Sequence, residues 1–118
     1  MLENISLISS VHKGLSRKES QDKAYKALSL LGLENIASLR YNECSAKERF
    51  CVQLIRADTI KDTTIIIEQP FALLSQEEDL GFVIKLLTQL NISLQRVYII
   101  DLVHQENYYK EHQCLIEK

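Results

Sequence analysis

Residues that could act on a phosphate gather at two places in the chain. The first is a predicted helix start of five consecutive residues: Cys44, Ser45, Ala46, Lys47 and Glu48. A hydroxyl at a helix N-terminus can bind a phosphate, helped by free backbone amides and by the helix dipole. The second is the polar pair Glu68-Gln69, which follows an apolar run. Ligands of open α/β sheets collect at such strand ends, where one carboxylate could help to hold a metal.

Both places also have a purely structural interpretation. Ser45 stands three residues before Glu48, the spacing of a capping box in which hydroxyl and carboxylate satisfy backbone amides. Ala46 and Lys47 occupy positions where glycines would let a backbone approach phosphate closely. Glu48 adds negative charge. The sequence therefore favours a helix cap at Ser45 over a phosphate site.

The structural interpretation is also the stronger one for Glu68. One carboxylate without a phosphate makes a poor Mg²⁺ site. We therefore expect Glu68 and Gln69 to be a polar strand end closed by Pro70, and we predict no metal site and no catalytic residue.

The cysteines and histidines offer weaker candidates. Cys44, Cys51 and Cys114 are an odd number without C-x-x-C spacing, which argues against a disulfide framework or a zinc site. Cys44 could be activated by the helix N-terminus, but no base stands at a recognisable spacing, so buried thiols are expected. His104, near Asp101 and Glu106, could exchange protons, although a surface position is the simpler expectation.

Three helices that must position these residues begin with the same signal. Ser16, Ser45 and Ser75 each precede a glutamate by three residues. Apolar residues recur at helical spacing after each serine, and Gly32 is well placed to end the first helix.

Two β-branched or apolar runs, residues 63–67 and Val97–Ile100, are predicted to form strands. A weaker third candidate covers residues 114–116. The helix between the first two runs makes a βαβ unit, so we predict an α/β fold with parallel strands. Because both runs are apolar on both faces, we expect both faces of the sheet to be buried.

The bulk properties fit a single domain over residues 1–118. Apolar residues make up 46% and charged residues 25%, and the net charge is −2. The chain has no excess of basic residues, so its charge does not indicate a nucleic-acid partner. No apolar run approaches the ~20 residues of a membrane span, and the start lacks the pattern of a signal peptide. We expect a cytoplasmic protein.

The order and spacing of these segments resemble the C-terminal half of the ABC-transporter ATPase domain. Residues 1–41, which include Leu30-Leu31-Gly32-Leu33, are similar to its helical subdomain, and residues 42–118 to its signature helix and α/β part. Residues 44–48 fall on the signature L-S-G-G-Q. Without a gap, Arg56-Ala57 falls on R-A and residues 68–70 on the Walker B D-E-P. Leu74 and Ser75 fall on the D-loop. The resemblance implies a partial P-loop-NTPase-like fold with a small N-terminal helical part.

The motifs of that family are degenerate in this chain. No phosphate-binding G-x-x-x-x-G-K-[ST] occurs. Glu68 replaces the aspartate that holds Mg²⁺, and Gln69 replaces the glutamate that polarises water. We therefore expect no ATP hydrolysis by this chain alone. The resemblance implies ATP and Mg²⁺ only with a competent partner.

Three functions stay open from the sequence. The resemblance implies an accessory or structural component of a transport complex at the inner face of a membrane. Its partner would then be an ATPase subunit or a permease, and self-association is compatible with this interpretation. The alternatives are a free-standing protein-interaction module and a fragment of a longer, active ATP-binding subunit.

Overall fold

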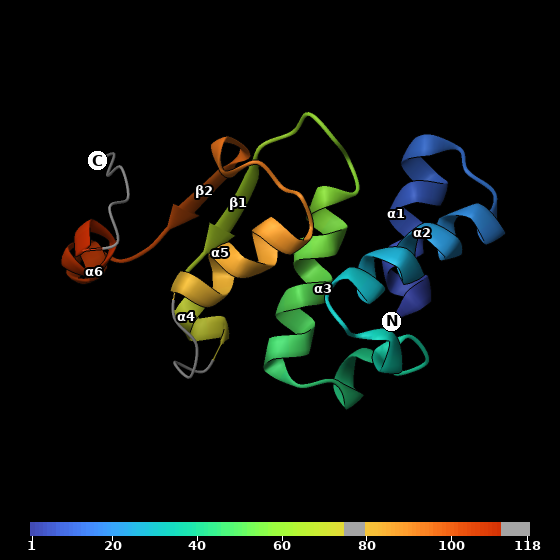
Figure 1. The fold of residues 1–118 in the computed structure, drawn as a ribbon, viewed down its shortest axis with the longest axis horizontal. Coiled ribbons are helices and arrows are strands. Elements are labelled where there is room, and N and C mark those ends of the chain that lie inside the picture. The colour runs from blue at the N-terminus through green and yellow to red at the C-terminus, as the bar shows by residue number, and fades with distance from the viewer. Residues whose placement is uncertain (75–79, 112–118) are drawn as a thin grey trace.

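The computed structural model describes residues 1–74 and 80–111, which are mainly helical with one small sheet (Figure 1). The helix cap predicted at Ser75 lies outside the described residues, and so does the candidate strand at 114–116. Helices α1 (Leu2–Lys13) and α2 (Arg17–Leu30) pack against each other at one end of the molecule. No helix over Leu2–Lys13 is predicted from the sequence.

Helix α2 ends as predicted, at a left-handed glycine. Gly32 has φ +69°, and its N–H donates to the carbonyl of Ser29 at 3.0 Å. The N–H of Leu33 donates to the carbonyl of Leu28 at 2.9 Å. This pair of bonds is a Schellman motif, which satisfies two carbonyls at the helix end. The predicted stop at Gly32 is confirmed.

Helix α3 (Ala46–Asp58) lies between the helical pair and the sheet (Figure 1). It contacts α1 and α2 on one side and the short helix α4 (Pro70–Leu73) on the other. Its buried apolar residues belong to one hydrophobic core that extends from Met1 to Tyr109. The helical part and the strand part are therefore joined through α3.

The sheet has two parallel strands, β1 (Ile65–Glu68) and β2 (Val97–Ile100). Ile65 pairs with Val97, and Glu68 pairs with Ile100. Helix α5 (Leu80–Gln89) lies between the two strands in the chain, after the short helix α4. The predicted parallel pairing is confirmed, while the relation to a P-loop NTPase fold stays a prediction.

The expectation that both faces of this sheet are buried is wrong. Ile65 and Ile67 share the hydrophobic core with the buried side of α5. On the other face, three apolar side chains are exposed over about half their surface: Ile66 at 60%, Tyr98 at 51% and Ile100 at 52%. The physical reason is that no second layer of described residues buries this face, which we call the open face.

An ion-pair network fixes the connection from α3 to β1 against the start of β2. Asp58 is buried at the end of α3 and binds Arg96 at 2.9 Å and Lys61 at 2.8 Å. Arg96 also donates to the backbone carbonyls of Thr63, at 3.0 Å, and Ile60, at 3.3 Å. One guanidinium thus replaces the hydrogen bonds that these carbonyls would make with water.

Helix α6 (Glu106–Glu111) packs against the rest of the domain through a buried tyrosine. Tyr109 is buried, and its hydroxyl donates to a carboxylate oxygen of Asp101 at 2.6 Å. The hydroxyl of Tyr108 accepts from the N–H of Leu80 at 2.9 Å. The ring of Phe71 meets that of Tyr108 edge to face, with centroids 5.4 Å apart. These contacts hold α6 beside the starts of α4 and α5.

Candidate functional site

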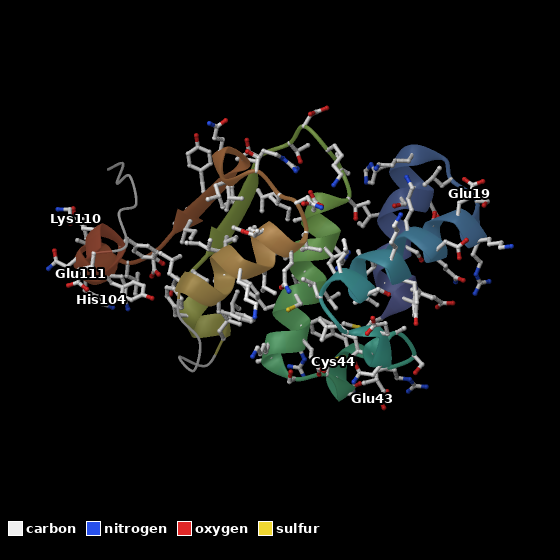
Figure 2. The ribbon with its side chains drawn as sticks, viewed as in Figure 1. Glu19, Glu43, Cys44, His104, Lys110 and Glu111 are labelled. Carbon is white, nitrogen blue, oxygen red and sulfur yellow. The ribbon has the colours of Figure 1, made fainter. Side chains whose placement is uncertain are left out.

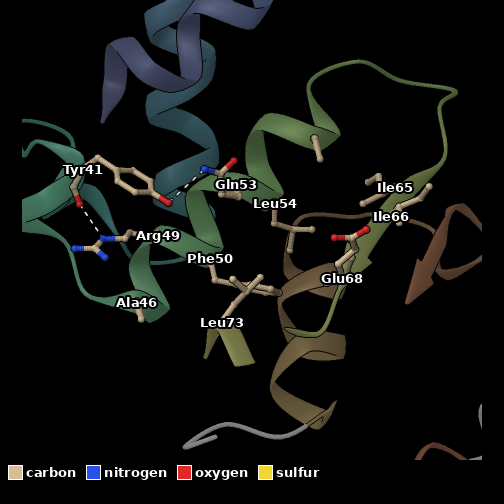
Figure 3. Close-up of a pocket in the computed structure, with 12 residues that line it drawn as sticks. Tyr41, Ala46, Arg49, Phe50, Gln53, Leu54, Ile65, Ile66, Glu68 and Leu73 are labelled. Atoms are coloured by element: carbon tan, nitrogen blue, oxygen red, sulfur yellow. Dashed lines mark hydrogen bonds between the residues drawn. The ribbon is translucent and has the colours of Figure 1, made fainter. Parts of the chain in front are cut away.

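A groove of about 640 Å³ lies between α3 and the free edge of β1 (Figure 3). Its strand wall consists of four consecutive residues, those of β1 (Ile65–Glu68). Successive side chains of a strand point to opposite faces, so only the edge of a strand can present four in a row. The groove therefore follows the edge of β1 rather than one face of the sheet. Its other lining residues are Tyr41, Ala46, Arg49, Phe50, Gln53, Leu54, Ala57 and Leu73.

The helix wall is held together by contacts with Tyr41. The Nε of Arg49 donates to the carbonyl of Tyr41 at 3.0 Å, and its guanidinium carbon lies 5.2 Å from the centre of the tyrosine ring. Gln53 donates to the tyrosine hydroxyl at 3.4 Å. Figure 3 shows these side chains on one side of the groove, with Phe50 below them. This wall is thus positively charged at Arg49 and apolar at Phe50.

The strand wall presents bare backbone groups. The N–H of Gln69 donates to the carbonyl of Ile100 at 2.8 Å. The backbone N–H and C=O groups of Gln69, and of every second residue before it, therefore point toward β2. The N–H and C=O groups of Ile66 and Glu68 therefore point to the opposite side, the free edge. In the described part of the chain these four groups have no hydrogen-bond partner. The Glu68 carboxylate projects into the groove (Figure 3).

The signature-like residues form a helix cap, as the capping-box spacing predicts. The Ser45 hydroxyl accepts from the N–H of Glu48 at 3.1 Å, and the Glu48 carboxylate accepts from the N–H of Ser45 at 2.8 Å. Lys47 lies with its ammonium nitrogen 4.7 Å from the centre of the Phe82 ring. Ala46 alone of these residues lines the groove. Ser45 and Lys47 thus have contacts within the domain instead of a preformed phosphate cradle.

We predict that Ser45→Ala lowers the free energy of unfolding by about 1 kcal/mol, because it removes one half of the capping box. Urea unfolding followed by circular dichroism measures this loss. Ser38→Ala is the matched control, because Ser38 is exposed and caps no helix. An unchanged stability of Ser45→Ala would show that the cap contributes nothing.

The two described cysteines are buried rather than reactive. Cys44 lies at the start of α3 (Figure 2). Burial raises the pKa of its thiol, and the negative charge of Glu48 adds to the effect. Burial also raises the pKa of Cys51 to about 11. A raised pKa leaves little thiolate at neutral pH, so the expectation of buried thiols holds and a nucleophilic Cys44 is disfavoured.

Glu68 and Gln69 form the expected polar strand end. Gln69 takes the left-handed conformation, with φ +43° and ψ 60°, and begins α4 ahead of Pro70. Leu74, the first D-loop-like residue, is buried in the core. Within residues 1–74 and 80–111, no group of three or more His, Cys, Asp or Glu side chains could hold a metal. His104 is exposed near α6 (Figure 2), and Asp101 binds Tyr109.

The structure therefore brings together Ala46 and Glu68, from the two predicted places, on opposite walls of one groove. Three residues of the helix wall, Tyr41, Arg49 and Gln53, are not among those predicted from the sequence. The signal for the helix wall was present, since Ala46, Phe50 and Leu54 recur every four residues on α3. Nothing local could show that this stripe faces a strand edge.

Comparison with protein-family models, with curated proteins and with solved structures gives no match to this chain. The resemblance to an ABC ATPase domain accordingly stays a prediction drawn from motif order and spacing. None of the helices within residues 1–74 and 80–111 is both long and apolar enough to cross a bilayer.

Proposed function

We propose that this chain is a non-catalytic interaction domain that binds a partner polypeptide through the open face and adjoining free edge of its sheet. The observation that carries the proposal is the exposure of Ile66, Tyr98 and Ile100 on a parallel sheet. Parallel sheets occur almost only with both faces covered. An exposed apolar face of this kind is characteristic of a surface that meets another protein.

Covering this face supplies a large part of the free energy that specific binding needs. Fully burying one side chain such as Ile or Phe contributes about 1.5–3 kcal/mol. The three side chains of the open face are each about half exposed, and Leu73, at 56% exposure, lines the groove. Their combined burial supports an affinity in the micromolar range only if the partner also satisfies the free strand edge.

A role in a transport complex is the more specific form of this proposal. It is supported by the ungapped order of the signature-like cap, Arg56-Ala57 and the Glu68-Gln69-Pro70 strand end. In that form the partner is an ATPase subunit or a permease, and the chain works as an accessory component at the inner face of a membrane. A fragment of a longer ATP-binding subunit would instead meet the missing half of its own domain.

Photocrosslinking tests the proposed interaction. A benzophenone amino acid replaces Tyr98 on the open face or, as the control, Tyr25 on α2, whose exposure of 47% is nearly the same. In the cells that naturally make the protein, we expect a crosslinked polypeptide from position 98 and none from position 25. Mass spectrometry of that product separates a transport subunit from other partners. Equal products, or none, from the two positions would refute the proposal.

We also predict no ATP hydrolysis by the purified chain. Ser45, Lys47 and Glu48 are engaged within the domain, and the sequence has no phosphate-binding loop. Gln69→Glu should not restore turnover, because positioning and charge stabilisation dominate phosphoryl transfer. Phosphate release measured with and without Mg²⁺ checks this. Turnover that Glu68→Ala abolishes would contradict it.

A further inference from the structure

The geometry points to an extended peptide segment of the partner as the occupant of the groove between α3 and β1. This inference rests on the proposed function and gives the partner's chemistry. The segment adds as a strand to the free edge of β1 and carries a Lys or Arg side chain that lies against Glu68. Apolar side chains on the segment contact the floor of the groove and the neighbouring part of the open face.

The backbone groups at the groove set the first requirement on its occupant, which is that the occupant's main chain can pair with them. Ile66 and Glu68 together offer two N–H donors and two C=O acceptors along the free edge. The main chain of an extended segment presents donors and acceptors with the same alternation, which is the basis of strand addition. A helix cannot satisfy this edge, because its own N–H and C=O groups are bonded within it.

The side chains at the groove set the second requirement. Phe50 and Leu54 on α3 and Leu73 at the end of α4 give it an apolar lining. Ile66 continues this lining onto the open face. An occupant that alternates apolar and polar residues would bury its apolar side there while the other side stays in water.

Charge sets the third requirement. Glu68 is exposed, projects into the groove, and has no hydrogen bond or ion pair among the described residues. Arg49, on the opposite wall, is already held by Tyr41. On neighbouring strands, side chains directly opposite each other interact, and opposite charges are favourable there. The residue of the occupant beside Glu68 is therefore basic.

Two synthetic peptides test these requirements together. Each has capped ends and alternates valine with threonine, and the twin peptides differ only by a central lysine or glutamate. We expect the lysine peptide to bind about tenfold more tightly, which corresponds to ~1.4 kcal/mol. Nitrogen-15 NMR of the labelled chain measures both affinities. Equal binding of the two peptides, or binding of neither, would overturn the inference.

Hydrogen exchange then tests the strand itself. In the complex with the lysine peptide, the amides of Ile66 and Glu68 should exchange at least about tenfold more slowly, because new hydrogen bonds protect them. The amide of Ile99, which faces away from β1 on β2, is the internal control. Protection of Ile99 without protection of Ile66 would place the peptide on the wrong edge and refute the inference.

Three variants complete the test. Ile66→Pro removes one outward N–H from an edge position where proline is tolerated. It should therefore weaken the binding of the lysine peptide about tenfold or more. Ile66→Val retains the N–H and should bind nearly as the parent chain does. Glu68→Lys should reverse the preference between the twin peptides. Binding that Ile66→Pro leaves intact would refute strand addition.

The outcomes separate this inference from the proposed function. If position 98 crosslinks to a partner while the peptides fail these tests, the open face binds another protein without strand addition. If position 98 yields no partner, the proposed function fails, whatever the peptides do.

Discussion

Replacing Asp58 by alanine should lower the free energy of unfolding by about 3 kcal/mol, the largest effect expected of any polar substitution in this domain. Asp58 is nearly buried at the end of α3 and pairs with Arg96, whose side chain is only 21% exposed. Without the carboxylate, the guanidinium of Arg96 stays largely desolvated and loses its counter-charge. The connection from α3 to β1 and the start of β2 would then lose their common anchor.

Lys61→Ala is the matched control for this prediction. Lys61 binds the same carboxylate, but its side chain is 60% exposed, so its removal should cost less than about 1 kcal/mol. Urea unfolding of both variants measures the difference. Equal losses would show that the exposed and the buried partner contribute alike and that Asp58 is not the anchor described above.

Leu28→Ala should lower the free energy of unfolding by about 3 kcal/mol through loss of buried contacts and creation of a cavity. Leu28 lies on α2 with none of its surface exposed, in the part of the core that α2 shares with α1 and α3. Leu30 on the same helix is 48% exposed. Leu30→Ala should therefore change stability by no more than about 0.5 kcal/mol. Thermal and urea unfolding check both variants, and a small effect at Leu28 would contradict the assigned core.

Local signals predicted the parts of this fold that depend on neighbours in the sequence. The capping spacing at Ser45 and the glycine at position 32 correctly marked a helix start and a helix end. The run Val97–Ile100 is the second strand as predicted. Each of these signals acts through hydrogen bonds or packing within a few residues, so the sequence contains it directly.

Features that depend on distant residues escaped prediction. The apolar runs at the strands suggested burial on both faces, yet burial requires a second layer that the described residues do not supply. The burial of Tyr109 on α6 depends on its contacts with Asp101 and Phe71. Helix α1 was missed for a different, local reason, because its N-terminus has no side-chain cap.

The candidate site shows the same division. The helix cap at Ser45 and the polar strand end at Glu68 were predicted with their structural roles. The groove between them was not, because it depends on how α3 and β1, which follow each other in the chain, are placed relative to each other in three dimensions (Figure 3). The free edge of β1 depends on which strands are present in the sheet, and no local pattern contains that information.

The central claim is that the open face serves a partner rather than the domain's own fold. The triple variant Ile66→Thr, Tyr98→Thr, Ile100→Thr tests it most directly, because threonine suits a strand while removing most of the apolar surface. We predict a free energy of unfolding within about 1 kcal/mol of the parent chain. We also predict loss of the partner that is crosslinked when the benzophenone is placed at Leu73, in the groove next to β1. A variant that fails to fold, or one that crosslinks the same partner undiminished, would contradict the claim.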